Sequence, residues 1–440
     1  MNPDTAITIS PASRCGKNSS TLPAPRMPRA LMALGVALCG TMAASAQSLP
    51  AWSTVDDVEN GAQSGIATDR SGNVFVAGGV NNESGGSYGC ISRSSDRGAK
   101  WLSSVHSEVQ YYTAIAGATI EIAPATGATQ AVLQDQLVAS GLQNGRWITR
   151  KSLNAGVTWQ TVDVFQHASS DSSYRPDSRS VAIDSSGNIF VVGKAVKTTV
   201  VRNKASSFSY WLVRKIGKDA TAENEVGKTT MDLFETGKGG GSGATGITCV
   251  GNNIFVAGES GDRWQVRKNT GGGASWELVD DFRYSPDHKS EANAISADNS
   301  GILYVVGIGC RAVGKTTPSY WIVRKGTGIG TSSFQTVDRY ERGTNGNGSA
   351  YANAVVVDAQ GNVNVTGGAG EWITRRLQAG STTWTTTDHF FLNTAYGSAG
   401  YSIAADRDGN VFAGGLGYDG IGWHDWVVRR QLAPVPPLVP

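Results

Sequence analysis

The sequence carries almost no net charge, and this excludes one class of partner. Its 38 Lys and Arg residues against 36 Asp and Glu residues leave a formal charge of +2 over 440 residues. The basic residues are spread along the chain, so nucleic acid is not an expected partner. Cysteine and histidine are scarce, at five residues each, and none has metal-ligand spacing. No nucleotide, phosphate or zinc fingerprint occurs, so we expect neither a metal nor a cofactor.

Long apolar runs are missing except near the N-terminus. Arg26 and Arg29 precede the apolar run 30–43, and a small-x-small pattern ends at Ala46, as in secretory signals. The run is short for a bilayer span, which makes a retained anchor the weaker alternative. We therefore predict a signal peptide over residues 1–46, cleaved near Ala46. The mature chain should be secreted or periplasmic and have no membrane span.

Cleavage leaves three cysteines in the mature chain, namely Cys90, Cys249 and Cys310. Three cysteines can form at most one internal disulfide, with one thiol left over.

Glycine is abundant, with 56 residues, and much of it returns at fixed places in a repeat. A segment of the form Trp-x-Val-Arg-Lys recurs at intervals of about 40 to 60 residues, the length of one propeller blade. Its seven copies begin at Cys90, Trp147, Trp211, Trp264, Trp321, Trp372 and Trp426, of which the first is degenerate.

Two further segments keep the same period. One has two β-rich runs around Asp-x-x-Gly-Asn, as in 181–193 and 355–367, and predicts a hairpin whose glycine supplies a positive φ. The loop Asp406–Asn410 resembles a calcium loop, but its recurrence in the repeat favours a plain turn. The other segment, Trp-x-x-Val-Asp, follows each Arg-Lys strand, as at 276–280.

Together these segments give four strands per unit, called A to D here in chain order. Seven such units predict an all-β fold, a seven-bladed β-propeller of four-stranded antiparallel blades over 47–430. The mature chain opens with a lone D strand at 52–58 and ends with strands A, B and C only. The N-terminal strand should therefore pair with the last blade and close the ring. A proline-rich tail follows at 431–440, and we expect a monomer.

The segment between strands C and D carries a second signature. Ser94–Trp101 matches Ser-x-Asp-x-Gly-x-x-Trp in full, and Ser152–Trp159 is a close variant. Both resemble the Asp-box (BNR) repeat of sialidases and other secreted propellers, while strands A and B look like the repeat of secreted bacterial seven-bladed propellers. The resemblance implies a structural turn in which the carboxylate caps backbone amides and the Trp packs between sheets. The N-terminal Arg-Ile-Pro element of sialidases is lacking, so no sialidase catalytic residue is carried over.

The arginine repeated in strand C is a candidate anion clamp, but one arginine per blade on a peripheral strand favours a framework role. In a C–D hairpin this arginine falls beside the first aromatic residue of strand D, which allows a cation–π contact. We therefore expect the pairs Arg150–Trp159, Arg267–Trp276 and Arg324–Phe334.

The connections from B to C and from D to A are long and varied, and they share the face opposite the short A-to-B turns. Binding chemistry is expected on such a loop face. Counting back from the Asp that ends strand A predicts a rim around the central channel: Ser64, Tyr112, Arg179, Thr245, Asn293, Asn353 and Tyr401, with Asp177, Glu291 and Tyr351 two residues earlier. The loop of the last blade adds Trp423 and His424.

Within this rim, Asp177 and Glu291 are the best carboxylates for acid/base chemistry, and Arg179 is the best anion clamp. Aromatic and polar side chains together suit sugars, which makes the following residues candidates for ligand binding: Tyr112, Asn293, Tyr351, Asn353, Tyr401, Trp423 and His424. The leading hypothesis is a binding protein for a glycan (a polysaccharide) or an extracellular protein. A glycoside hydrolase or polysaccharide lyase is the alternative, and a structural surface module the second. A solvated rim without a ligand also accounts for these polar residues.

Overall fold

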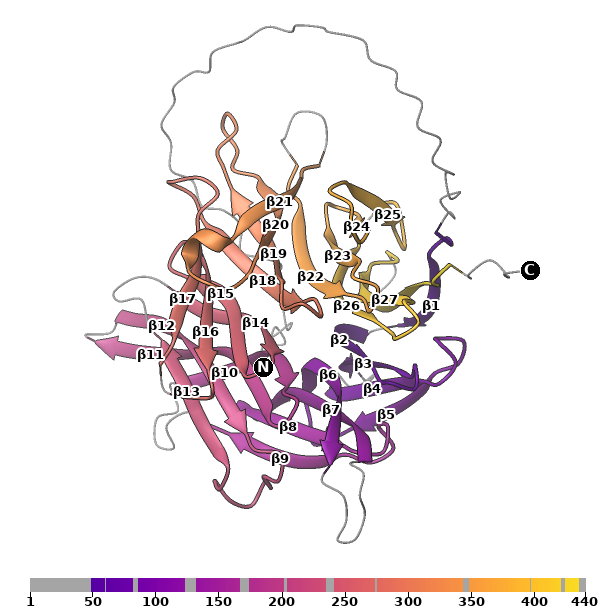
Figure 1. Cartoon of the computed structure of the whole chain (residues 1–440), viewed down its shortest axis with the longest axis vertical. Helices are drawn as coiled ribbons and strands as arrows, with labels where there is room; N and C mark the ends of the chain where they lie inside the picture. Colours follow the sequence, from indigo (N-terminus) through magenta and orange to yellow (C-terminus); the bar gives the residue numbers. More distant parts are fainter. Residues whose placement is uncertain are drawn as a thin grey trace, which may run out of the picture.

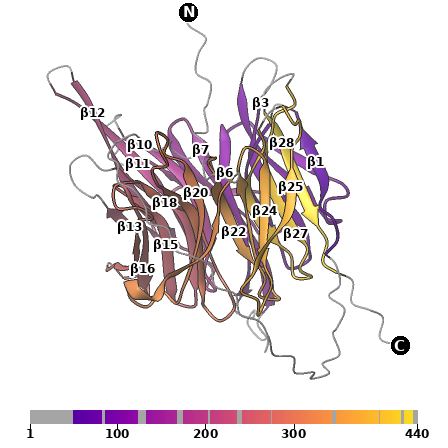
Figure 2. The ribbon, with the colours of Figure 1, turned by 90° about the horizontal axis from the view of Figure 1, so that it is seen from above.

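The chain folds as a ring of seven four-stranded antiparallel sheets (Figure 1), so the predicted seven-bladed β-propeller is confirmed. This computed structural model describes residues 49–59, 61–81, 86–122, 132–166, 174–201, 204–234, 241–273, 275–342, 348–395, 397–420 and 424–434. Figure 2 shows the strands crossing the thickness of the disc. Among the described residues, no helix is long and apolar enough to cross a membrane.

Each blade contributes one strand of each type. The A strands are β2 (Gly61–Thr68), β6 (Tyr111–Ile122), β10 (Tyr174–Ile183), β14 (Ser242–Val250), β18 (Ser290–Ala297), β22 (Tyr351–Val357) and β26 (Ala399–Ala405). The B strands are β3 (Val74–Asn81), β7 (Val132–Gln143), β11 (Ile189–Val201), β15 (Asn253–Ser260), β19 (Leu303–Cys310), β23 (Val363–Gly368) and β27 (Val411–Gly417). The C strands are β4 (Ser87–Ser94), β8 (Arg146–Ser152), β12 (Lys204–Ile216), β16 (Arg263–Thr270), β20 (Ser319–Gly326), β24 (Trp372–Leu377) and β28 (Asp425–Gln431). The D strands are β5 (Leu102–His106), β9 (Gln160–Phe165), β13 (Lys228–Phe234), β17 (Glu277–Phe282), β21 (Gln335–Tyr340), β25 (Trp384–Phe390) and β1 (Ser53–Val58), and a 3-10 turn, η1 (Thr331–Ser333), precedes β21.

The ring closes through its first strand. β1 pairs antiparallel with β28, so the seventh sheet has the order β1-β28-β27-β26. The A strands of neighbouring blades contact one another all the way round, which places them innermost. This closure is the one that the lone N-terminal D strand predicted. It protects the edge of the last blade with a strand from the other end of the described chain.

Buried tryptophans from strand C pack between neighbouring blades. Six of them are under 2% exposed: Trp147, Trp211, Trp264, Trp321, Trp372 and Trp426. Each of these strands pairs with a D strand that ends on an aromatic or aliphatic residue, and in blade five Trp321 meets Tyr340 edge-on at 6.2 Å between ring centres. Blade one has Gly89 at this place, because Gly89 pairs with His106 as Trp321 pairs with Tyr340.

In five blades the A-to-B connection is a turn capped by its own aspartate, namely Asp69, Asp184, Asp298, Asp358 and Asp406. In the last blade, the Asp406 carboxylate accepts hydrogen bonds from the backbone N–H groups of Asp408 and Asn410, at 3.0 and 2.9 Å. Gly409 has a φ of 86°, a conformation that favours glycine. The turn interpretation of Asp406–Asn410 is thereby confirmed. Among the described residues, no group of three or more metal-ligating side chains occurs.

The segment that resembles an Asp box also forms a capped turn. Asp96 Oδ1 accepts a hydrogen bond from the Lys100 N–H at 2.8 Å, and Ser94 Oγ accepts one from the Gly98 N–H at 2.7 Å. The indole N–H of Trp101 donates to the carbonyl of Val55, which belongs to the preceding blade, at 2.8 Å. The turn therefore caps its own amides and anchors one blade to the next.

The strand-C arginines are framework residues, but their main partners lie in the preceding blade rather than in their own. Arg324 donates two hydrogen bonds to Asp280 of β17, at 2.8 and 2.7 Å, and stacks on Phe282 at 4.2 Å. Within its own blade it donates to the Phe334 carbonyl and to Thr336 Oγ1 of β21, both at 3.3 Å. We call the interface between two neighbouring blades a seam. The same arginine–aspartate ion pair crosses five seams: Arg214–Asp163, Arg267–Asp232, Arg324–Asp280, Arg375–Asp338 and Arg429–Asp388.

The expected cation–π pairs need correction for this reason. Arg267 does lie 5.6 Å from the ring centre of Trp276, but Phe234 of the preceding blade is closer, at 4.0 Å. Arg150 meets Trp159 through the backbone carbonyl, at 3.1 Å. A guanidinium on strand C thus ties three strands of two blades together, which the hairpin register alone does not indicate.

Blade one breaks this pattern. Val305 pairs with Arg324 in blade five, whereas the equivalent Val76 pairs with Ser92. Arg93 therefore occupies the lysine position, and its assignment to the repeated arginine position is wrong. As a result, Asp56 of β1 has no arginine opposite it, and its Oδ2 is buried without a hydrogen-bond partner. Burial, reinforced by neighbouring Asp57, raises the pKa of Asp56 to about 6.

Of the three cysteines of the predicted mature chain, Cys90 and Cys249 are free thiols. No disulfide therefore joins either of them to Cys310.

Candidate functional site

The inner ring of the propeller is built by a β-bulge in every A strand. The seven bulge residues are Ser64, Thr113, Arg179, Thr245, Asn293, Asn353 and Tyr401. A bulge leaves one residue outside the ladder and redirects its side chain. Six of these residues are the ones that the repeat alignment predicted, and all seven are at least partly exposed.

The exception is blade two, where the predicted rim residue Tyr112 lies one position too early. Tyr112 is fully buried, and the bulge falls on Thr113. The Tyr112 ring packs where a side chain on Gly89 would otherwise lie, since a Cβ there would meet the ring at 2.9 Å. The phenol thus fills the place of the tryptophan missing from blade one, and its hydroxyl lies 2.6 Å from His106 Nδ1.

Several bulge side chains latch one blade to the next. The Asn293 amide donates to the Ala352 carbonyl at 2.9 Å, and the Asn353 amide donates to the Gly400 carbonyl at 2.8 Å. Thr245 donates to the Ala292 carbonyl at 2.7 Å. The side-chain amides of Asn293 and Asn353, both predicted as ligand-binding residues, therefore each already donate one hydrogen bond to the neighbouring blade.

The residues two positions before the bulge carry the charge of the inner ring on blades three and five. Asp177 pairs with Arg179 at 2.6 Å, and Asp177 also stands opposite Lys194 in the β10–β11 register. Glu291 pairs with Lys289, which binds Glu259 of blade four at 2.6 Å. Asp177 and Glu291 are thus held in two separate charged clusters.

The Glu259–Lys289–Glu291 cluster is mostly buried. Its side chains are 24%, 21% and 11% exposed, respectively. Burial and the adjacent Glu291 carboxylate raise the pKa of Glu259 to about 7, and the two carboxylates raise the pKa of Lys289 despite its burial. Lys289 opposes the shift of Glu259, but burial and the negative charge of Glu291 outweigh it.

Tyrosines occupy the rest of the inner ring. Tyr111 of blade two, Tyr351 of blade six and Tyr401 of blade seven are all partly buried. Burial and the nearby Asp177 carboxylate raise the pKa of Tyr111, and burial and the nearby Tyr351 raise the pKa of Tyr401. The ring therefore has a charged part on blades three to five and a phenolic part on blades two, six and seven.

The last-blade loop contributes less than the sequence suggested. His424 is exposed, and its ring lies 5.7 Å from the ring of Tyr418. Trp423 lies outside the described residues.

Sequence reasoning missed Glu259, Lys289 and Tyr111. Glu259 directly follows the glycine that ends the Val-x-Gly pattern of strand B. Aligning that position across the blades would have found it together with Lys194. The rim prediction depends on strand A alone, whereas Glu259 and Lys194 come from strand B.

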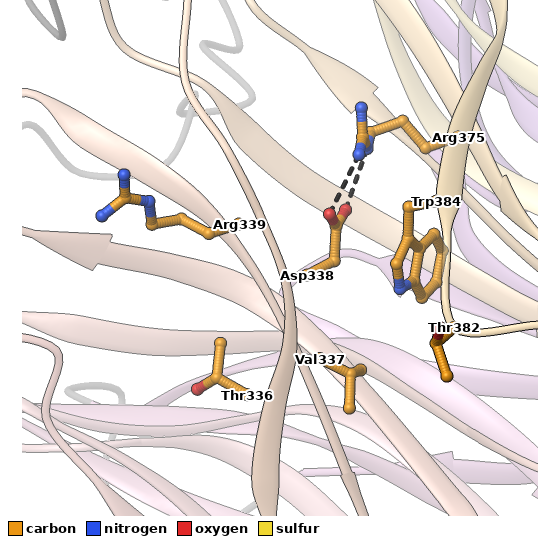
Figure 3. Close-up of a pocket in the computed structure, with 7 residues that line it drawn as sticks. All are labelled: Thr336, Val337, Asp338, Arg339, Arg375, Thr382 and Trp384. Carbon is orange, nitrogen blue, oxygen red and sulfur yellow. Dashed lines mark hydrogen bonds and ion pairs between the residues drawn. The ribbon is translucent and has the colours of Figure 1, made fainter. Parts of the chain in front are cut away.

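An open pocket of about 380 Å³ lies elsewhere, at the seam between blades five and six (Figure 3). The Asp338–Arg375 ion pair forms its wall, with Oδ–N distances of 2.9 Å, and Trp384 lies beside it. These are framework residues that recur at other seams, so this pocket is not the candidate site.

Comparison with known proteins supports the fold and little more. No protein-family model matches the chain, and neither does any curated protein. A puromycin-hydrolyzing peptidase of Mycobacterium tuberculosis aligns at 13% identity with a TM-score of 0.52, over 89% of this chain and 57% of that one. A Dyadobacter fermentans protein of unknown function aligns at 11% identity and a TM-score of 0.42, over 88% and 100% of the two chains. Trypanosoma rangeli sialidase aligns at 10% identity and a TM-score of 0.41, over 71% and 57%. The chain thus spans little more than half of the peptidase, and at this identity the likeness defines the class as β-propeller without defining its chemistry.

Proposed function

We propose that this chain is a secreted or periplasmic β-propeller that recognises a glycan on the loop face, at the inner ring described above. The observation that carries the proposal is the contrast between framework and ring. The ion pair between blades recurs at five seams and the capped turn in five blades, whereas the bulge residue of the ring is Ser, Thr, Arg, Asn or Tyr, depending on the blade. A surface selected only for stability has no need of this variety.

The chemistry of the ring suits a sugar. Tyr351 and Tyr401 offer partly buried aromatic surface for the apolar faces of pyranose rings. Asp177, Arg179 and Lys194 offer charged acceptors and donors for hydroxyl groups within the same ring. Export is supported by the predicted signal over residues 1–46, and the N-terminal mass of the secreted protein tests cleavage near Ala46.

A glycan array tests the binding function. Wild type should bind a restricted set of glycans, and Tyr351→Ala should lose this binding because the aromatic platform is removed. The variant Asp408→Asn with Glu121→Gln, which changes two exposed carboxylates outside the ring, should bind as wild type does, and it is also the matched control for the acidic double variant described below. If no glycan binds to the wild type, or if Tyr351→Ala binds as well as wild type, the proposal fails.

The buried Glu259–Lys289–Glu291 cluster favours a second candidate, a glycoside hydrolase or polysaccharide lyase. A carboxyl group with a pKa of about 7 can hold a proton at neutral pH and donate it to a leaving group. Reducing-end release from bound glycans, measured from pH 5 to 9, tests this activity. The double variant Asp177→Asn with Glu291→Gln separates the two functions: an enzyme would lose turnover, whereas a lectin has no turnover to lose and would still bind glycan, with altered affinity. Absence of released product at every pH would rule out the enzyme.

A further inference from the structure

Blade five presents arginines around one buried tyrosine on the loop face. The guanidinium carbons of Arg311 and Arg339 lie 5.5 and 5.7 Å from the ring centre of Tyr320, and so no more than 11.2 Å from each other. Tyr284 packs on the same ring, with 5.1 Å between centres, and its hydroxyl accepts a hydrogen bond from Arg339 at 2.9 Å. Tyr320 is fully buried beneath these side chains.

Arg311 and Arg339 differ from the seam arginines in that no buried aspartate pairs with them among the described contacts. Each seam arginine such as Arg324 is buried against an aspartate, whereas Arg311 is exposed and Arg339 is 44% exposed. Arg339 makes a long ion pair with the partly exposed Glu341, at 3.7 Å. Figure 3 shows Arg339 directed away from the neighbouring Asp338–Arg375 pair.

The surrounding segments add to the positive charge. The stretches 283–288, 311–318 and 339–342 contain five basic residues, Arg283, Arg311, Lys315, Arg339 and Arg342, against two acidic ones, Asp287 and Glu341. Clustered like charges cost free energy unless an anion offsets them. A nearly neutral chain that concentrates them on one blade therefore favours an anionic ligand at that place.

This patch is continuous with the inner ring. The Cys310 N–H donates to the Lys289 carbonyl at 2.8 Å, and Arg311 is the next residue. The Tyr284 N–H donates to Ser290 Oγ at 2.9 Å, one residue from Glu291. A chain bound at the ring can therefore pass over blade five without leaving the surface.

We propose that Arg311 and Arg339 form a subsite for the anionic substituents of an acidic glycan that extends outward from the inner ring. The tyrosines hold both guanidinium groups in place, so that each can donate planar pairs of hydrogen bonds to a carboxylate or a sulfate. This inference rests on the proposed glycan-binding function and names the class of ligand. Carboxylate and sulfate share the same chemistry here, and the experiment distinguishes them.

The test measures binding of the full chain to polygalacturonate, dextran sulfate and neutral dextran by calorimetry at low and high salt. The variant Arg311→Gln with Arg339→Gln should weaken binding of at least one polyanion about tenfold or more at low salt. Its effect should shrink as salt screens the charges. The matched control Arg70→Gln with Lys100→Gln removes two exposed positive charges at turns remote from blade five and should change nothing.

Preference for polygalacturonate would assign the subsite to uronates, and preference for dextran sulfate would assign it to sulfate esters. Equal weakening by both double variants would overturn the inference, because it would show diffuse attraction. So would failure of wild type to bind either polyanion. If Tyr351→Ala abolishes polyanion binding while the arginine variant binds as wild type, the inference fails and the proposed function stands.

Discussion

The substitution Asp56→Asn should stabilise the protein at neutral pH, although the same change at an equivalent position should destabilise it. Asp56 sits at the seam where the arginine is replaced by Ser92, and its pKa is raised from 3.8 to about 6. The folded state therefore prefers the protonated carboxyl group. Stability contributed by this preference is present at low pH and is lost as the pH rises through about 6.

The size of the effect follows from this shift. About two pKa units at 1.36 kcal/mol each correspond to roughly 3 kcal/mol. Because Asp56 is only partly buried, solvent screening reduces this to about 1–2 kcal/mol. Asn keeps the shape without the charge, so Asp56→Asn should raise the free energy of unfolding by that amount at pH 7.5 and change it little at pH 4.

The matched variant is Asp388→Asn. Asp388 accepts hydrogen bonds from Arg429 at 2.8 and 2.6 Å, and both side chains are mostly buried. Its neutralisation leaves a buried arginine without a counter-charge and should cost about 3 kcal/mol. Urea unfolding of wild type and both variants at pH 4, 6 and 7.5 measures these differences. A destabilised Asp56→Asn at pH 7.5, or a pH-independent difference from wild type, would refute the reasoning.

Three further outcomes are expected. Arg150→Ala should lower the free energy of unfolding by about 1–2 kcal/mol, since Arg150 pairs with Glu108 and donates to the Trp159 carbonyl, and should leave glycan binding unchanged; loss of binding at an unchanged melting temperature would contradict the framework role. Asn353→Ala should cost about 1 kcal/mol by removing the latch to the Gly400 carbonyl, seen as a lower urea midpoint, and an unchanged midpoint would show that the latch contributes nothing. Burial raises the pKa of the Cys249 thiol to about 12, so a thiol reagent at pH 8 should label Cys249 far more slowly in native protein than in urea; equal rates would contradict this.

The fold could be predicted because its signals are local and repeated seven times. The Asp-x-x-Gly-Asn motif predicts the A-to-B turn, and the lone D strand at 52–58 predicts the closure of the ring. Neither prediction requires knowing which side chains of neighbouring blades meet. The partner of Arg324 could not be found in this way. Asp280 lies 44 residues earlier, and a repeat alignment gives no information about which neighbour a side chain faces.

Errors in the candidate site also have a physical origin in blade one. The repeat pattern assigns Arg93 to the arginine position because it is the only arginine in this copy, but the register places Ser92 there. Blade two has no Asp at the end of strand A to fix the count, so the pattern assigns Tyr112 to the rim, whereas the Tyr112 ring fills the space above Gly89. The loss of the tryptophan in blade one is thus compensated by a tyrosine in blade two, and this exchange disturbs the repeat pattern of both blades.

The bulge explains why stability and binding should be separable in one strand of this propeller. In β18, Asn293 is the bulge residue and spends its amide on the Ala352 carbonyl, whereas Glu291, two residues earlier, is held by Lys289 at the inner ring. Asn293→Ala should therefore lower the urea midpoint by removing a latch, with glycan affinity per folded molecule unchanged. Glu291→Gln should alter glycan affinity or its pH dependence, because it changes the charge of the Glu259–Lys289–Glu291 cluster. A midpoint unchanged by Asn293→Ala, or an affinity unchanged by Glu291→Gln at every pH, would show that this division of roles within β18 is wrong.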